Sequence, residues 1–233
     1  MSSFVIEKAL SLKIAILAAA VSVSLAVVSQ PMAAQDADPD LQAPELAVKY
    51  FVLHPNPKFL ACLAGPSGNA PIARVTVTRG KLNDILQITG QNFKPGLAFD
   101  MFTVQRSNLL PDATPDPNFT NFGMAWYQSD LQVNSQGRFN ATIQTILLDQ
   151  IFGFDPDQSN PSPINTFNLG FWFNDPNDAN VDGCTFDVTK PTPFNGEHHA
   201  GPVAMITVPN ATTGLGPLCT SPNVKTHPAS CNP

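Results

Sequence analysis

The sequence predicts an all-β protein, an antiparallel β-sandwich with long loops rich in proline and asparagine. Short apolar or alternating segments recur along the chain, separated by turn signals roughly every dozen residues. No long segment shows the apolar period of an amphipathic helix. The chain has 23 prolines and only 13% charged residues, a composition that suits a loop-rich exported protein better than a helical cytosolic enzyme.

The first 34 residues have the pattern of an export signal. Lys8 and Lys13 make the start positive, residues 14–28 form an apolar run, and Ala33-Ala34 offers a cleavage site. The run of 15 residues is shorter than the roughly 20 that cross a bilayer, which leaves an uncleaved anchor as the alternative. We therefore expect a secreted or periplasmic protein with no membrane span after cleavage.

The remaining chain divides into three parts: a flexible leader over 35–45, a sandwich domain over 46–208, and a tail over 209–233 rich in Pro, Ser and Thr. Apolar stretches and two-residue alternation predict the strands. Residues 147–152 could form a helical turn, and 112–118 and 155–165 are loops. The predicted strands cover 46–53, 74–79, 86–89, 97–104, 122–133, 138–145, 167–173 and 203–208, and the segment 203–208 is expected to be the last strand of the chain.

Alternation also predicts which side chains are buried. Apolar and polar residues exchange at every position in several of these strands, so one face of each belongs to the core. Residues 97–104 are apolar on both faces, as expected of a central strand covered on both sides. The predicted inward residues are Val75, Val77, Leu86, Ile88, Phe139, Ile143, Phe167, Leu169, Phe171 and Phe173.

Two turn segments carry a resemblance to a known family. Residues 86–96 read LQITGQNFKPG, a strand followed by Gly-x-Asn-Phe and then Pro-Gly, and residues 134–139 read NSQGRF, a hairpin turn signal. The first resembles the opening hairpin of IPT/TIG-type immunoglobulin-like modules, and the second resembles a hairpin common in exported bacterial sandwich repeats. The resemblance implies an immunoglobulin-like sandwich with a binding, spacer or surface-display role and no catalytic residues.

Four cysteines lie in the mature part of the chain: Cys62, Cys184, Cys219 and Cys231. An even number in an exported protein predicts two disulfides, for which three pairings exist. A local bridge from Cys219 to Cys231 is the simplest prediction, and it would leave Cys62 for Cys184. Zinc is the competing interpretation, which the absence of a C-x-x-C pair disfavours.

The segment DANVDG over 178–183 predicts a calcium loop. Asp178, Asn180 and Asp182 would supply oxygens, and Gly183 would let the chain turn around the ion. The twelfth loop position is Thr189, where such loops have a bidentate glutamate. The alternative is an Asn/Asp-rich turn held by its own side-chain to backbone hydrogen bonds. Of the metal sites that the sequence suggests, calcium at this loop is the one it favours most.

Two tryptophans are candidates for a carbohydrate platform. Strict alternation places Trp172 on a face with Asn168, and Trp126 on a face with Gln128 and Asp130. A flat ring beside amides offers an apolar surface with polar edges. The alternative is that both rings are buried, as large aromatic side chains usually are.

Three further motifs have a chemical and a structural interpretation. Glu197-His198-His199 could bind a metal or form hydrogen bonds in a loop, and Asp155 with Asp157 could act as an acid/base pair or belong to a turn. Residues 65–68 (GPSG) form a turn rather than a nucleophile elbow.

Net charge and motifs together limit the function. A formal charge of −6 excludes the basic footprint that nucleic-acid binding requires. The sequence predicts an exported, non-catalytic module that binds carbohydrate or another extracellular protein, or is otherwise surface-associated. The alternative is a secreted polysaccharide hydrolase whose carboxylate site is built from loops.

Overall fold

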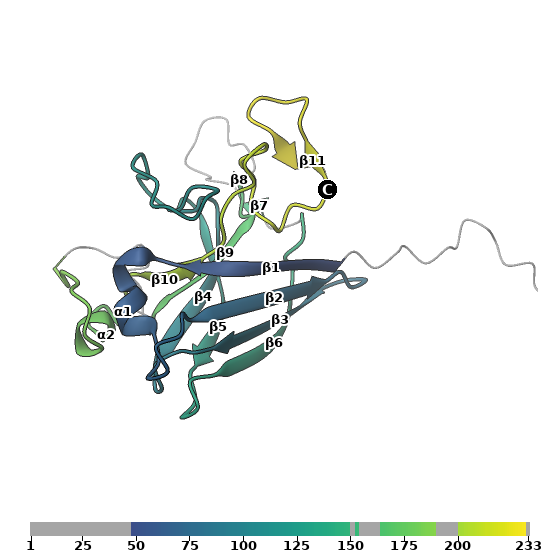
Figure 1. Ribbon diagram of the computed structural model, residues 1–233. Helices are drawn as coiled ribbons and strands as arrows, with labels where there is room; N and C mark the ends of the chain where they lie inside the picture. The colour runs from purple at the N-terminus through teal and green to yellow at the C-terminus, as the bar shows by residue number, and fades with distance from the viewer. Residues whose placement is uncertain (1–47, 150–151, 154–163, 190–199, 232–233) are drawn as a thin grey trace, which may run out of the picture. The chain divides into compact units, whose positions relative to one another are not determined.

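The computed structural model describes residues 48–149, 152–153, 164–189 and 200–231 (Figure 1). The predicted signal and leader lie outside these residues, as do Asp155, Asp157 and Glu197-His198-His199.

The described chain is an all-β protein built from antiparallel strands, as predicted. Its only helical elements are a short 3₁₀ turn and two single α-turns: η2 (Pro57–Phe59), α1 (Leu60–Leu63) and α2 (Asp178–Val181). The main strands are β1 (Val48–Pro55), β2 (Ile72–Thr78), β3 (Asp84–Gln91), β4 (Ala98–Val104), β5 (Ala125–Gln132), β6 (Phe139–Thr145), β9 (Asn168–Phe173) and β10 (Val203–Ile206). Four short strands form two small ladders: β7 (Phe152–Gly153) with β8 (Ile164–Asn165), and β11 (Pro222–Asn223) with β12 (Ser230–Cys231).

The eight main strands form one sheet in the order β5-β4-β9-β10-β1-β2-β3-β6. Strand β1 joins its two halves, because it pairs with β2 over Val48 to Leu53 and with β10 only at His54 and Pro55. The sheet curls until its edge strands β5 and β6 come into contact, so it is nearly a barrel.

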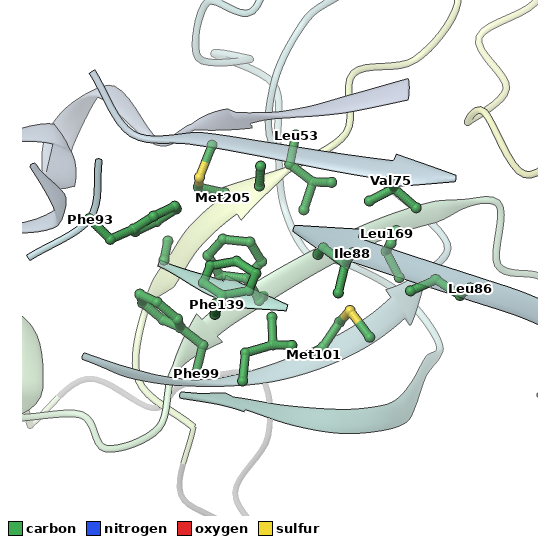
Figure 2. Packing of buried hydrophobic residues seen from close by; sticks show 14 of the residues in the cluster. Leu53, Val75, Leu86, Ile88, Phe93, Phe99, Met101, Phe139, Leu169 and Met205 are labelled. Atoms are coloured by element: carbon green, nitrogen blue, oxygen red, sulfur yellow. The ribbon is translucent and has the colours of Figure 1, made fainter. Parts of the chain in front are cut away.

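The main core lies between the two halves of the sheet. Figure 2 shows Phe93, Phe99 and Phe139 gathered with aliphatic side chains from strands of both halves. Phe99 and Phe171 have ring centroids 4.7 Å apart, and Phe139 meets Phe171 edge-on at 5.8 Å. All the predicted inward residues belong to this core, although Ile143 is only partly buried.

A second, smaller cluster covers the opposite face of β4 and β9. Phe102 and Trp172 meet edge-on with centroids 5.5 Å apart, and Phe122 packs against Trp172 at 5.0 Å. Strand β4 is therefore covered on both faces, as its apolar sequence predicts.

The turn at 90–96 does not form the predicted hairpin. Strand β3 continues to Gln91 and pairs with β2 and β6, whereas β4 pairs with β5 and β9. The segment instead carries the chain from one half of the sheet to the other. The turn at 134–137 forms as predicted, with hydrogen bonds from Asn134 N to Arg138 O and from Gly137 N to Asn134 O, but it also joins strands of different halves.

Two further sequence predictions were wrong. The helical turn expected over 147–152 is absent from its described residues: the N–H groups of Leu147 and Leu148 donate to Asp84 Oδ2, and Phe152 lies in β7. The strand at 203–206 is not the last one, since β11 and β12 pair within the tail. Short polar tails give little periodicity from which to predict such a ladder.

Both predicted disulfides are present, Cys62–Cys184 and Cys219–Cys231. The tail is also attached through Asp149, a buried carboxylate that pairs with Arg79 at 2.5 Å and accepts hydrogen bonds from the N–H and hydroxyl of Thr220. In the described residues, no helix is long and apolar enough to cross a membrane.

Candidate functional site

The outward side of β1, β2, β3 and β6 is an exposed, mostly polar surface, which we call the outer face. Alternation sends every second residue of each strand away from the core, and the antiparallel register lines these residues up from strand to strand. The outer face consists of Val48, Tyr50, Val52, Ile72, Arg74, Thr76, Thr78, Ile85, Gln87, Thr89, Gln91, Asn140, Thr142, Gln144 and, directly before β6, Arg138.

One cross-strand row of this face combines an aromatic ring with hydrogen-bonding side chains. Tyr50 pairs with Thr76, Thr76 with Gln87, and Gln87 with Thr142. Three strand spacings make the row about 14 Å wide. Tyr50 is 63% exposed, and Gln87 and Thr142 are exposed as well. The row therefore presents a ring, an amide and two hydroxyls to solvent.

An apolar groove borders the outer face at Tyr50. Strand β1 pairs with β10 only at His54 and Pro55, its last two residues. The chain that follows β10 does not pair with the earlier residues of β1, which leaves an opening beside them. The opening has a volume of about 380 Å³ and is lined by Phe51, Val208, Leu215 and Pro217 among others. Tyr50 thus lies between an apolar groove and a polar surface.

A polar hollow lies at the other end of the outer face. It has a volume of about 490 Å³, and Arg74 and Arg138 line it together with Thr89, Gln91 and Asn140. Guanidinium groups donate in a fixed planar fork that matches carboxylate, sulfate and phosphate oxygens.

Trp172 is not part of any exposed platform: of the two interpretations of this ring, burial is the one the structure confirms. Its ring is fully buried in the second cluster, against Phe102 and Phe122. Alternation correctly turns Trp172 away from Phe171 and Phe173, but a second layer of side chains covers that face of β9.

Trp126 is exposed, at 48%, but on a different face from the one predicted. A bulge opposes Met101 to Ser129 and Phe102 to Tyr127, so Gln128 is an extra residue in β5. The bulge reverses the alternation, and Trp126 does not share a face with Asp130. Tyr127 does, and its hydroxyl donates to Asp130 Oδ1 at 2.7 Å.

Two carboxylates meet at this position of the sheet. Asp100 in β4 lies opposite Asp130 in β5, and Asp100 is fully buried whereas Asp130 is exposed. Burial, the hydrogen bond to Asp130 and the negative charges of Asp130 and Asp100 raise the pKa of Tyr127 to about 12. The phenol therefore remains protonated as a hydrogen-bond donor at neutral pH.

The three predicted calcium ligands lie in and directly after α2, and each makes a contact of its own. Asn180 Oδ1 accepts from the N–H of Phe186 at 2.6 Å, and its Nδ2 donates to the carbonyl of Phe186 at 2.8 Å. Asp182 pairs with Lys94 at 2.8 Å. Asp178 Oδ2 accepts from the N–H of Asp175 at 3.2 Å.

A bound cation would offset the negative charges that surround Asp178. Burial, followed by the negative charges of Asp175 and Asp182, raises the pKa of Asp178, although the hydrogen bond from Asp175 N lowers it. Calcium binding at this turn stays a prediction. It requires Asn180 to exchange Phe186 for the ion and Asp182 to turn from Lys94.

Because these bonds must be exchanged, we expect weak calcium binding, with a dissociation constant on the order of 10⁻⁴–10⁻³ M. Calcium at 100 times that constant should then raise the free energy of unfolding by about 2.7 kcal/mol, and the melting temperature should rise with it. Melting in calcium and in chelator measures the effect, with Asp182→Ala as the variant. If the melting temperature is the same in calcium and in chelator, and Asp182→Ala does not change it, α2 is an ordinary turn.

Within the described residues, one group of three side chains has metal-ligand spacing: Asp149, Cys219 and Cys231. Both cysteines are oxidised in a disulfide, so they offer no thiolate to a metal. These three residues instead hold the C-terminal tail against the segment that contains Asp149.

Tyr50 is not among the site residues predicted from the sequence. Residues 46–53 are predicted as an apolar strand, with no face assigned to its side chains. The two-residue alternation of β1 could have assigned these faces. One set of alternate residues lies on the interior side, and the other set, which includes Tyr50, is exposed.

No family model, no curated protein and no solved structure matches this chain.

Proposed function

We propose that this protein is an exported, non-catalytic module that binds polysaccharide through the outer face. The observation that carries the proposal is the row of Tyr50, Thr76, Gln87 and Thr142. A sugar ring has apolar C–H faces and a rim of hydroxyls. The exposed tyrosine ring suits the former, and the amide and hydroxyls suit the latter.

The strands make this surface rigid. Each residue of the row lies inside a paired strand, and the other side of the sheet carries core residues such as Val75 and Leu86 that are fully buried. A ligand therefore has no backbone to order when it binds, which lowers the entropic cost of association.

Export, and the assignment to an immunoglobulin-like sandwich of IPT/TIG type, belong to the same proposal. Two disulfides support an oxidising compartment, which makes a secreted or periplasmic location the natural one. The core enclosed between the two halves of the antiparallel sheet supports a sandwich-related fold, although both halves belong to one sheet that is nearly a barrel. A binding or surface-display role is what the resemblance implies.

Replacing Tyr50 by alanine should weaken polysaccharide binding at least about fivefold, since aromatic anchors commonly contribute more than about 1 kcal/mol. Binding of the disulfide-bonded protein to a panel of soluble and insoluble polysaccharides provides the measurement. Trp126→Ala is the matched control, because Trp126 is a similarly exposed ring on β5. If Trp126→Ala abolishes binding and Tyr50→Ala does not, the ligand lies on β5 and the outer face is the wrong surface.

The second candidate is a secreted polysaccharide hydrolase, which the facing pair of Asp100 and Asp130 favours. We rank it second because Asp100 is fully buried, so it does not reach a polymer in water. Release of reducing ends from the bound polysaccharides tests it. Activity that disappears in Asp130→Asn but survives in Tyr50→Ala would establish the hydrolase in place of the binding module.

A further inference from the structure

The outer face is positively charged on a protein that is acidic overall. The whole chain has 18 acidic and 12 basic residues, yet the outer face contains no Asp or Glu and two arginines, Arg74 and Arg138. Local charge of the opposite sign to the net charge marks a surface that meets a ligand of complementary charge.

Neither arginine is neutralised by the described part of the protein. The ion pairs found there are Arg79–Asp149 and Lys94–Asp182, and both lie elsewhere. Arg74 is half-buried and Arg138 is exposed, so both guanidinium groups remain open to a ligand.

The sheet register brings the two arginines to one hollow. Arg74 lies opposite Thr89, which lies opposite Asn140, and Arg138 precedes Asn140 by two residues on the same side of β6. Strands β2 and β6 flank β3, so their backbones are about 10 Å apart. Both side chains line the hollow together with the polar groups of Thr89 and Gln91.

We infer that the ligand of the outer face is an anionic polysaccharide, with carboxylate or sulfate groups that Arg74 and Arg138 bind. This inference rests on the proposed function and names the chemical class of its ligand. Tyr50 and Gln87 contact the sugar rings, and two separated guanidiniums contact charges that recur along the polymer. Nucleic acid is disfavoured, since two arginines on an acidic protein are not the basic stripe that phosphate backbones require.

The test uses matched polymers and the disulfide-bonded protein. Polygalacturonate is compared with its methyl-esterified form, dextran sulfate with dextran, and single-stranded DNA serves as another polyanion. The variants are Arg74→Gln, Arg138→Gln and the double substitution. Lys81→Gln is the control, because it removes the same charge from an exposed residue of the β2–β3 turn, outside the outer face.

We expect the double variant to bind the charged polymer about tenfold more weakly, with little change for the neutral one and none in Lys81→Gln. Binding of the unaltered protein should also weaken as salt rises, and less steeply in the double variant. The carboxylate and sulfate arms show which anion is recognised.

Other outcomes separate the two claims. Equal binding of charged and neutral polymers that Tyr50→Ala weakens and the arginine variants do not would overturn the anionic ligand and keep the binding function. Binding of none of the four polysaccharides would overturn both. Preference for DNA over all of them would replace the polysaccharide by nucleic acid.

Discussion

Replacing both Cys62 and Cys184 by alanine should lower the free energy of unfolding by about 4–5 kcal/mol. The two cysteines are 122 residues apart, so their bond restricts a long loop of the unfolded chain. It also connects α1, between β1 and β2, with the segment after α2, between β9 and β10. These two connections belong to different halves of the sheet.

The second disulfide supplies the matched control. Cys219 and Cys231 are 12 residues apart, and the same substitutions there should lower the free energy of unfolding by only about 3 kcal/mol. Urea unfolding of the two double variants measures both effects, after alkylation of the native protein has verified that no thiol is free. Equal losses would show that loop length does not govern the stabilisation.

Replacing Phe139 by alanine should cost about 3–5 kcal/mol, because the substitution leaves a cavity in the main core. The Phe139 ring lies against Phe93 and Phe171, with centroids at 5.2 and 5.8 Å. It fills the space over Gly90, where an added Cβ would lie only 2.1 Å from a ring atom of Phe139. Ring and glycine are thus fitted to each other across β3 and β6.

Asn140→Ala is the control for this prediction, since the neighbouring Asn140 is exposed on the outer face. Its effect should be within about 0.5 kcal/mol. Chemical unfolding of both variants gives the comparison. Similar small losses at 139 and 140 would mean that the ring contributes little to the core.

The sequence was sufficient to predict which side chains are buried where a strand is regular and only one of its faces belongs to the core. In β2, Val75 and Val77 alternate with Thr76 and Thr78, and the structure follows this pattern without exception. The same signal predicted Leu86 and Ile88 in β3. Period-two alternation works here because a single layer of core lies on one side and solvent on the other.

Sequence reasoning failed where tertiary structure alters the alternation or its meaning. The bulge at Gln128 moves Trp126 to the other face of β5, and nothing in the local sequence predicts this bulge. Trp172 is buried because Phe102 and Phe122, distant in sequence, cover it. The turn residues of 90–96 correctly predict a turn, but turn chemistry does not specify which strand pairs with which.

The candidate site was harder to predict than the fold. Its residues come from four strands, and only the register brings Tyr50, Gln87 and Thr142 into one row. The faces of single strands can be predicted from alternation, whereas the order β1-β2-β3-β6 depends on long-range pairing. Arg74 and Arg138 line one hollow for the same reason.

The pairing of β1 with β10 determines how much of the chain must be made before the sheet can be completed. The first described strand and the last main strand are neighbours, so the sheet stays open along one side until the chain has been made as far as Ile206. Contacts between such distant segments form slowly, and an incomplete chain exposes unpaired strand edges that aggregate. A ribosome-bound fragment of this chain gains little by folding early. The topology therefore favours folding after all the main strands have been made, with the disulfides forming last.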